Sequence, residues 1–161
     1  CFAMADQSTQ LPKNKLPPTT RALPLALLRA RESVMAPIRE MLADADITEQ
    51  QWRVLRVLDD YGPLDASKLA EHACLLLPSQ TRIVQAMYEK GYVDRTQDAN
   101  DRRRQTVSIT ASGRKIIDAK RDEALAIARR FRAALGNEKY EALLDYLDEL
   151  HKLRVPSGGR S

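Results

Sequence analysis

An uninterrupted run of three arginines, Arg102, Arg103 and Arg104, is the feature of this sequence best suited to binding a polyanion. Guanidinium groups bind phosphates and guanine through paired N–H donors, and they stay charged at physiological pH. Asp101 lies two residues before Arg103, a spacing at which its carboxylate could hold that guanidinium in one orientation. We therefore predict an anion-binding loop at residues 98–104. The alternative is a solvated turn, in which a surface Asp–Arg pair contributes about 1 kcal/mol or less.

A second group of hydrogen-bonding side chains precedes this run along the chain. Its members carry hydroxyl, amide and guanidinium groups: Ser79, Gln80, Thr81, Arg82 and Gln85. Pro78 suits the first turn of a helix, where its missing N–H costs nothing, so the group falls in the first two turns of a predicted helix. The N-terminal part of a recognition helix is the part that contacts base edges in DNA. We predict that these side chains point outward and bind DNA; a merely solvated polar face is the alternative.

Helical patterns begin well before these residues. Apolar side chains at three- and four-residue steps predict a first helix over residues 23–43. Thr48 and Gln51 have the spacing of a capping box, and Ile47 and Trp52 flank it as a hydrophobic staple. These four residues predict the start of a second helix.

The hydrophobic period changes from helix to strand after the helix that begins at Pro78. Asp65 is suited to cap a short third helix, and Gly91 to end the fourth. Residues 92–96 and 105–109 then alternate as strands do, which predicts a hairpin with the arginine run at its tip.

The order of elements predicts the fold class, which is mainly α with a small β-hairpin. Two long helices follow the hairpin, from Thr110 to about residue 135 and over residues 140–150. Three helices and a hairpin make a winged helix-turn-helix, joined here to a helical dimerisation region. The predicted organisation is a flexible arm at 1–20, a dimerisation region at 21–46 and 110–153, a DNA-binding domain at 47–109 and a flexible tail at 154–161.

A second copy of the chain is the expected partner of the long helices. Their apolar stripes exceed what the DNA-binding domain alone can cover, and a two-fold homodimer is the commonest source of a further surface. Such a dimer would place two recognition helices about 34 Å apart, matching a pseudo-palindromic operator in double-stranded DNA. The alternative is that these helices pack only on their own DNA-binding domain.

The bulk composition permits DNA binding and disfavours other classes. The 161 residues are 43% hydrophobic and 30% charged, with a formal net charge of +4. No run approaches the roughly 18 apolar residues of a membrane span, and the two cysteines cannot form a disulfide framework, so we predict a cytoplasmic protein with no membrane partner. His72 and His151 lack a catalytic constellation, and no phosphate-binding glycine loop or metal-ligand spacing occurs. We therefore predict neither an enzyme nor a cofactor or metal.

Several motifs resemble those of the MarR (multiple antibiotic resistance regulator) family. The segment DANDRRRQTVSITASG at 98–113 resembles the wing of that family, and 81–83 with 91–93 resemble its recognition helix and following strand. Within the family, TEQQWRVLR at 48–56 and RESVM at 31–35 are most similar to regulators of homoprotocatechuate (4-hydroxyphenylacetate) degradation operons. The resemblance implies a dimer that represses a promoter and releases it when a small aromatic acid binds. It also implies that Arg103 enters the minor groove and that Asp101 braces it, although Ala99 replaces a common proline.

An effector with a phenolic ring and a carboxylate needs a cation for its acid and an apolar or aromatic wall for its ring. A site between the dimerisation helices and the DNA-binding domain would let the effector change the spacing of the two recognition helices. The candidate cations are Arg31, Arg39, Arg53, Arg56 and His72, and the candidate wall residues are Trp52 and Met35. Surface ion pairs for the arginines and a core position for Trp52 are the alternatives.

Two rival functions use the same fold. Some MarR regulators sense oxidants through a cysteine, and Cys74 is the candidate here. It lies in an apolar stretch, however, where we expect a small buried hydrophobe. A winged helix that binds protein instead of DNA is the other rival, and the arginine run argues against it.

Overall fold

The computed structural model describes residues 15–153. Contacts divide the chain into an N-terminal unit, residues 1–37, and a larger unit, residues 38–161. The predicted tail at 154–161 and residues 1–14 of the predicted arm lie outside the described residues. None of the helices within the described range is long and apolar enough to cross a membrane.

The N-terminal unit contains a short 3-10 turn, η1 (Thr19–Arg21), and most of helix α1 (Leu23–Met41). The Arg29 guanidinium donates hydrogen bonds to the carbonyl oxygens of Thr19 (3.3 Å) and Thr20 (3.2 Å), which fastens η1 to α1. Pro37 lies inside α1 where the two units meet, and its missing N–H interrupts the hydrogen bonding of the helix there.

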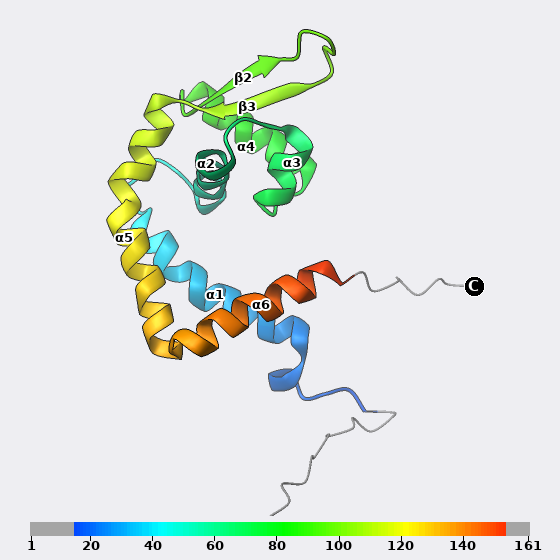
Figure 1. Cartoon of the computed structure of the whole chain (residues 1–161), viewed down its shortest axis with the longest axis vertical. Helices are drawn as coiled ribbons and strands as arrows, with labels where there is room; N and C mark the ends of the chain where they lie inside the picture. The colour runs from blue at the N-terminus through cyan, green and yellow to red at the C-terminus, as the bar shows by residue number, and fades with distance from the viewer. Residues whose placement is uncertain (1–14, 154–161) are drawn as a thin grey trace, which may run out of the picture. The chain divides into compact units, whose positions relative to one another are not determined.

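Three helices form the core of the larger unit: α2 (Glu49–Tyr61), α3 (Ala66–His72) and α4 (Leu77–Glu89). The three helices lie beside one another (Figure 1). Fully buried side chains from each of them, including Leu55, Leu69 and Met87, form the core between them. The Asp65 carboxylate caps α3 by accepting the Lys68 N–H at 2.9 Å, as predicted.

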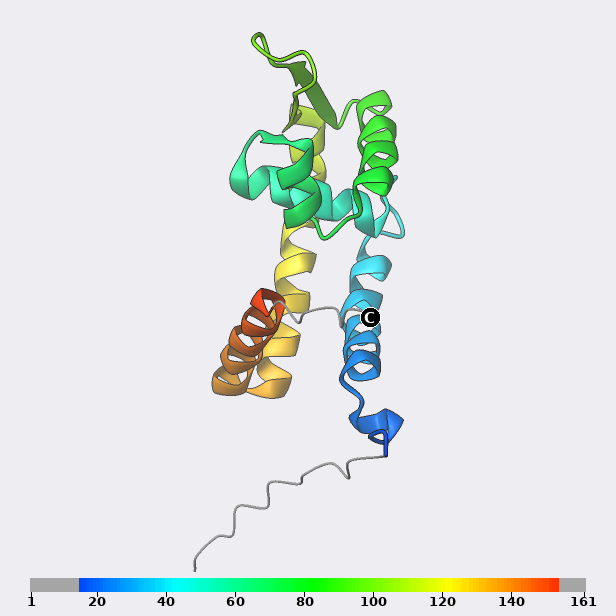
Figure 2. The same cartoon turned by 90° about the vertical axis from the view of Figure 1, so that its right-hand side faces the viewer.

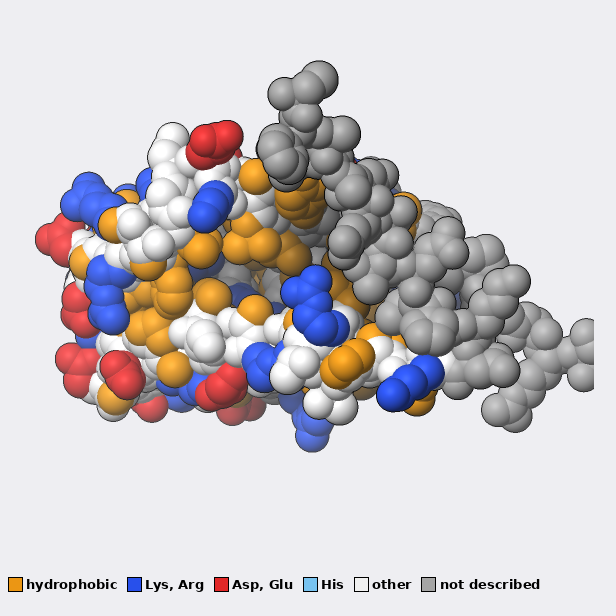
Figure 3. Space-filling view, turned by 90° about the horizontal axis from the view of Figure 1, so that it is seen from below, with side chains coloured by type: hydrophobic (Ala, Val, Ile, Leu, Met, Phe, Trp, Pro, Cys, Tyr) orange, Lys and Arg blue, Asp and Glu red, His pale blue; other side chains and the backbone are white. Residues whose placement is uncertain are grey.

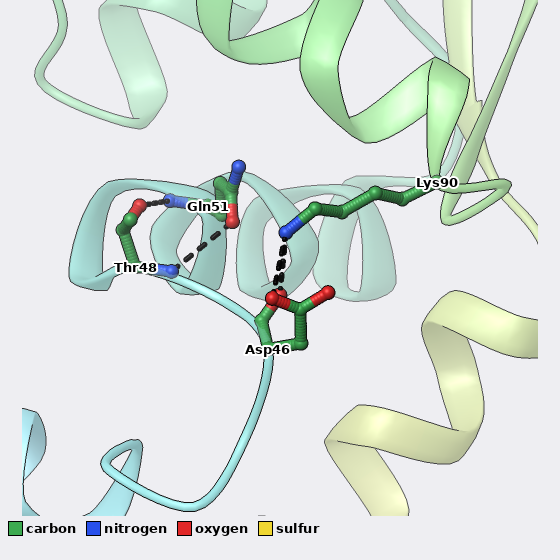
Figure 4. A network of polar contacts seen from close by, with 4 residues as sticks. All are labelled: Asp46, Thr48, Gln51 and Lys90. Carbon is green, nitrogen blue, oxygen red and sulfur yellow. Dashed lines mark hydrogen bonds and ion pairs between the residues drawn. The ribbon is translucent and has the colours of Figure 1, made fainter.

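A polar network fixes the start of α2 and joins it to the end of α4 (Figure 4). The predicted capping box is present: Thr48 Oγ1 accepts the Gln51 N–H at 3.2 Å, and Gln51 Oε1 accepts the Thr48 N–H at 3.1 Å. Lys90, the residue after α4, donates to the Asp46 carbonyl at 2.9 Å and pairs with its carboxylate at 3.1 Å. The loop before α2 therefore holds both helices.

The sheet has three antiparallel strands in the order β1-β3-β2, where the sequence predicted only a hairpin. Strands β2 (Val93–Gln97) and β3 (Gln105–Ile109) form that hairpin, with Val93 opposite Ile109 and Gln97 opposite Gln105. Strand β1 (Leu64–Asp65) adds to the free edge of β3. It was missed because two residues are too short to display an alternating pattern.

Two long helices complete the chain: α5 (Ala111–Leu135) leads away from the sheet, and α6 (Asn137–Lys152) follows a sharp turn at Gly136 (Figures 1 and 2). Gly113, in the first turn of α5, packs so closely that a Cβ there would collide with the Tyr92 carbonyl oxygen and the side chains of Ile109 and Leu55. This contact sets how close α5 lies to the sheet.

Apolar side chains remain exposed on helices α1, α5 and α6. On α5 and α6 they are Leu125, Leu135, Leu143, Leu144 and Leu147. The N-terminal unit exposes Leu23, Leu27, Leu28 and Val34 on α1. Figure 3 shows hydrophobic side chains gathered between charged ones on one face of the molecule. Within residues 15–153, the chain itself does not cover these apolar groups.

Candidate functional site

Helix α4 presents one polar and one buried face. Val84 and Met87 are buried in the core, while Thr81, Arg82 and Gln85 are exposed. Ser79 is half-buried at the start of the helix and lines a surface hollow with Arg82. Thr81 and Arg82 lie in the first half of α4, and Gln85 lies one turn further on.

Gln80 is a correction to that prediction. Its side chain is only 2% exposed, so it belongs to the core and not to the outward face. The reason is helical spacing, because Gln80 precedes Val84 by four residues and Met87 by seven, and all three therefore share one face. The same periodicity was readable in the sequence.

The polar residues of α4 differ in how far they are already engaged. Thr81 Oγ1 donates to the Leu77 carbonyl at 3.0 Å, and Gln85 Nε2 donates to Glu89 Oε1 at 2.8 Å. Within the described residues Arg82 has no hydrogen-bond or ion-pair partner, so its guanidinium is available to a ligand.

The tip of the hairpin is a rigid turn built by aspartates. The Asp98 carboxylate accepts the Asn100 N–H at 2.8 Å, and the Asp98 N–H donates to the Arg104 carbonyl at 2.9 Å. The Asp101 carboxylate accepts the backbone N–H of Arg103 at 3.0 Å. Asp101 thus holds the backbone of the turn, and the prediction that it holds the Arg103 guanidinium is wrong for this structure.

The side chains of Arg102, Arg103 and Arg104 are all exposed at this turn. None of the three guanidinium groups has a hydrogen-bond or ion-pair partner among residues 15–153. The carboxylates of Asp98 and Asp101 accept hydrogen bonds from backbone N–H groups, which holds the turn. The tip therefore presents unpaired guanidinium groups on a hydrogen-bonded backbone.

A cation–π contact that the sequence did not predict ties the hairpin to α4. The Arg95 guanidinium of β2 lies 4.3 Å from the centre of the Tyr88 ring on α4. Such contacts stabilise exposed sites by about 0.5–1 kcal/mol. The pairing joins residues on different elements, so no local pattern signals it.

A cavity of about 340 Å³ lies between α2 and α5, and it contains two of the predicted effector residues. Trp52 and Arg56 of α2 line it together with Arg121 of α5. Its remaining lining is apolar: Ile38, Ile117, Ala124, Leu125 and Ala128. Two cations beside an aromatic and aliphatic wall are the groups that a small aromatic carboxylate requires.

Arg121 was missed by the sequence analysis. It follows Ile117 by four residues and precedes Ala124 by three, so the apolar stripe of its own helix was the available signal. The Asp118 carboxylate accepts its hydrogen bond at 2.7 Å and raises the pKa of Arg121. Arg56 lies 3.9 Å from Asp60 in a looser ion pair. Each guanidinium group is therefore partly oriented by a carboxylate of its own helix.

The other predicted effector residues have different roles or places. Arg39 pairs with Glu49 at 3.2 Å, and His72 stacks on Tyr61 with ring centres 4.2 Å apart. Arg53 donates to the carbonyls of Ala73 (2.8 Å) and Cys74 (3.1 Å), which holds the turn between α3 and α4. None of these three side chains lines the cavity, so the structure does not group them with Trp52.

Arg31 and Met35 lie one helical turn apart on α1, in the N-terminal unit. Arg31 is exposed and Met35 is half-buried. Their assignment to the effector site remains a prediction.

Cys74 is exposed, which corrects the prediction that it is buried. It adopts a left-handed backbone conformation with φ of +53° just after α3, where the Leu75 N–H returns to the Ala70 carbonyl at 2.9 Å. This chain reversal, which usually favours glycine, turns the thiol away from the core. Among the described residues no cluster of His, Cys, Asp and Glu could hold a metal ion.

Comparison with known proteins shows one family match and relatives that are similar over most of the chain. Residues 47–104 match the MarR family. The transcriptional regulator FarR of Neisseria gonorrhoeae is 38% identical over 80% of this chain and 88% of its own. The homoprotocatechuate degradative operon repressor of Escherichia coli is 34% identical over 80% of this chain and 86% of its own. The crystal structure of NadR in complex with 4-hydroxyphenylacetate has a TM-score of 0.73 and 36% identity, covering 94% of this chain and 100% of that one.

Proposed function

The chain belongs to the MarR family of DNA-binding transcriptional regulators, which are not enzymes, and we propose that it represses an aromatic-acid catabolic operon until a phenolic acid releases it. The sequence prediction of this family, and of a likeness to homoprotocatechuate operon regulators, is confirmed. Among the similar solved structures, the repressor CouR is bound to a 23-mer DNA duplex, and a MarR variant of Escherichia coli is complexed with operator DNA. What we propose for this chain is therefore its operator, its effector and the operon that it regulates.

The proposal of DNA binding rests on one observation: two cationic surfaces lie on the same unit of the chain. The outward face of α4 offers Arg82, and the hairpin, which serves as the wing, offers the unpartnered guanidiniums of residues 102–104. A helix of this size fits the major groove, and a narrow arginine-bearing hairpin can reach the adjacent minor groove. We assign direct DNA contacts to Ser79, Thr81, Arg82, Gln85, Arg102, Arg103 and Arg104.

The effector part rests on the cavity beside Trp52. We assign the carboxylate of the effector to Arg56 and Arg121, and its ring to Trp52 and the aliphatic wall. The cavity lies against α2 of the DNA-binding domain and α5 of the predicted dimerisation region. An effector bound there would alter how the two regions pack, and so the spacing of the two recognition helices in a dimer. The binding of 4-hydroxyphenylacetate by NadR supports this ligand class.

Isothermal titration with 4-hydroxyphenylacetate and 3,4-dihydroxyphenylacetate tests the effector assignment. We expect heat with the wild-type protein and a loss of affinity in Arg56→Gln and Arg121→Gln, because each variant removes a charged hydrogen bond worth about 1.5–3 kcal/mol. Arg129→Gln, an exposed site on α5 outside the cavity, is the matched control. Absence of heat with both acids would eliminate this ligand class.

The exposure of Cys74 favours one second candidate, a repressor of the same fold that responds to oxidants. An accessible thiol is a requirement for such a sensor. Gel shifts with peroxide decide between the two: loss of the oxidant response in Cys74→Ser would support the thiol sensor. If peroxide leaves DNA binding unchanged in the wild type, this candidate fails.

A further inference from the structure

A basic hollow lies between the start of α3 and the wing, apart from the effector cavity. Its volume is about 310 Å³, and Lys68, Arg103 and Arg104 line it together with Ser67, Gln105 and Asp65. A neighbouring hollow of about 210 Å³ is also lined by Lys68 and Arg104. Lys68 of α3 and Arg104 of the wing therefore border the same stretch of surface.

Sheet pairing explains why residues so far apart in sequence meet here. Strand β1 leads directly into α3, and its Asp65 pairs with Thr106 of β3. Lys68 lies three residues after Asp65, and Arg104 lies two residues before Thr106. The short strand that the sequence analysis missed is thus the element that brings the two cations together.

Within the described residues, the cations of this hollow have no partner, whereas two lysines elsewhere in the larger unit are paired. Lys90 and Lys120 each pair with an aspartate, at 3.1 and 2.5 Å. By contrast, the Lys68 ammonium and the Arg104 guanidinium have no hydrogen-bond or ion-pair partner in the part of the chain that the structure describes. The carboxylate in the hollow, Asp65, already accepts the backbone N–H of Lys68 at 2.9 Å. The hollow therefore holds an excess of uncompensated positive charge.

We propose that Lys68 and Arg104 together bind one backbone phosphate of duplex DNA in this hollow. The inference rests on the proposed DNA-binding function and extends it to α3. The first helix of a helix-turn-helix crosses the DNA backbone while the second enters the groove, so α3 is placed to meet a phosphate when α4 binds. Lys68 and Arg104 then fix the register of the complex without reading sequence, and Arg103 remains available for the groove.

Salt-dependent DNA binding tests this site. Affinities of wild type, Lys68→Ala, Arg104→Ala and the double variant would be measured by fluorescence anisotropy on the intergenic DNA upstream of the chain's own gene and on a scrambled duplex. Each phosphate contact contributes about 0.9 to the slope of log K against log salt, so a shared phosphate predicts that the double variant loses about 0.9 per copy. The loss of affinity should be equal on the two duplexes, because a phosphate contact carries no sequence information.

The possible results separate this inference from the proposed function. Lys139→Ala, an exposed lysine on α6, should leave the slope unchanged. Wild-type slope in the double variant would overturn the phosphate site, and a loss of about 1.8 per copy would mean two separate phosphates and overturn the shared one. Failure of the wild-type protein to bind either duplex would overturn the proposed function itself, and this inference with it.

Discussion

At the scale of single residues, the structure divides the cations into those that hold the protein together and those left for ligands. Arg53 binds the backbone of the α3–α4 turn, and Arg39 pairs with Glu49. Arg82 and Arg103 have no such partner within the described range. A guanidinium without an internal partner needs no internal bond broken before it binds DNA. The unpartnered group is therefore where substitutions should affect DNA binding and leave folding intact.

Arg103→Ala should weaken operator binding between about fivefold and 150-fold, the range for losing one bidentate base contact. The exposed position predicts an unchanged melting temperature and an unchanged dimer. Anisotropy titrations measure the affinity, and sedimentation velocity measures the oligomeric state. Arg130→Ala on α5 is a matched control. Unchanged operator affinity in Arg103→Ala would contradict the assignment of the wing.

Residue-level roles were only partly predictable from sequence. The Thr48 cap and the exposed arginines follow from local pattern, and the structure has both. The Asp101 carboxylate could reach either the side chain or the backbone of Arg103, and sequence spacing does not distinguish them. Arg121 shares the apolar stripe of α5, which is readable in the sequence, but the packing of α5 against α2 that forms the cavity is not.

At the scale of elements, close packing and ion pairs set how α5 lies against the DNA-binding domain. Gly113 allows α5 to approach Tyr92 and Leu55. About two turns further on, Lys120 donates to the Asp44 carboxylate at 2.5 Å, and so connects α5 to the loop before α2. The helix positions were predictable from periodicity, but β1 and these contacts between elements depend on the assembled fold.

Gly113→Ala should destabilise the protein by about 1–3 kcal/mol, the usual cost of overpacking a close contact. The backbone carbonyl of Tyr92 cannot move aside as the end of a flexible side chain could. Urea unfolding measures the change, and Ser112→Ala, at the neighbouring exposed position, is the control. Equal stability of Gly113→Ala and wild type would contradict the close packing.

The Asp44–Lys120 pair predicts a pH-dependent stability. The hydrogen bond from Lys120, followed by its charge, lowers the pKa of Asp44, so the folded chain binds fewer protons at this carboxyl than the unfolded chain near the ordinary aspartate pKa. The stabilisation is therefore present above that range and is lost as the pH falls through the lowered pKa. Asp44 also holds the pKa of Lys120 above its usual value, so that contribution is lost only in strong alkali.

Asp44→Asn should accordingly lower the melting temperature at neutral pH and have little effect in strong acid, where the carboxyl is protonated in both states. Thermal unfolding followed by circular dichroism across the acid range measures this difference. Asp145→Asn, at an exposed aspartate on α6, is the control and should leave the melting temperature unchanged at neutral and at acid pH. If the melting temperature of Asp44→Asn were lower than that of the wild type by the same amount at every pH, the ion pair would not be the cause.

At the scale of the whole molecule, exposed leucines are the feature that a single copy does not explain. Leu143 and Leu147 lie four residues apart on α6 and are 45% and 39% exposed. Apolar stripes of this kind are covered in symmetric dimers, and two-fold symmetry would present two recognition helices to one duplex. The apolar pattern of these helices was readable in the sequence, while the partner that covers them remains a proposal.

Leu147→Glu should dissociate the dimer, because it places a charge in an apolar interface, and it should leave the fold of each copy intact, because the position is exposed within one chain. Sedimentation velocity gives the mass, and circular dichroism checks the fold. Lys139→Glu on the same helix should leave the mass unchanged. A monomeric wild-type protein, or a dimeric Leu147→Glu variant, would contradict this role of α6.

The most direct test of the account is the stoichiometry and footprint of the protein on the intergenic DNA upstream of its own gene. We predict two chains per duplex, with two protected half-sites about one helical turn apart. We also predict that Arg103→Ala weakens the complex and that a phenolic acid releases it. A single chain bound per site, or a complex unaffected by Arg103→Ala, would contradict the proposal that two copies present α4 and the wing to one operator.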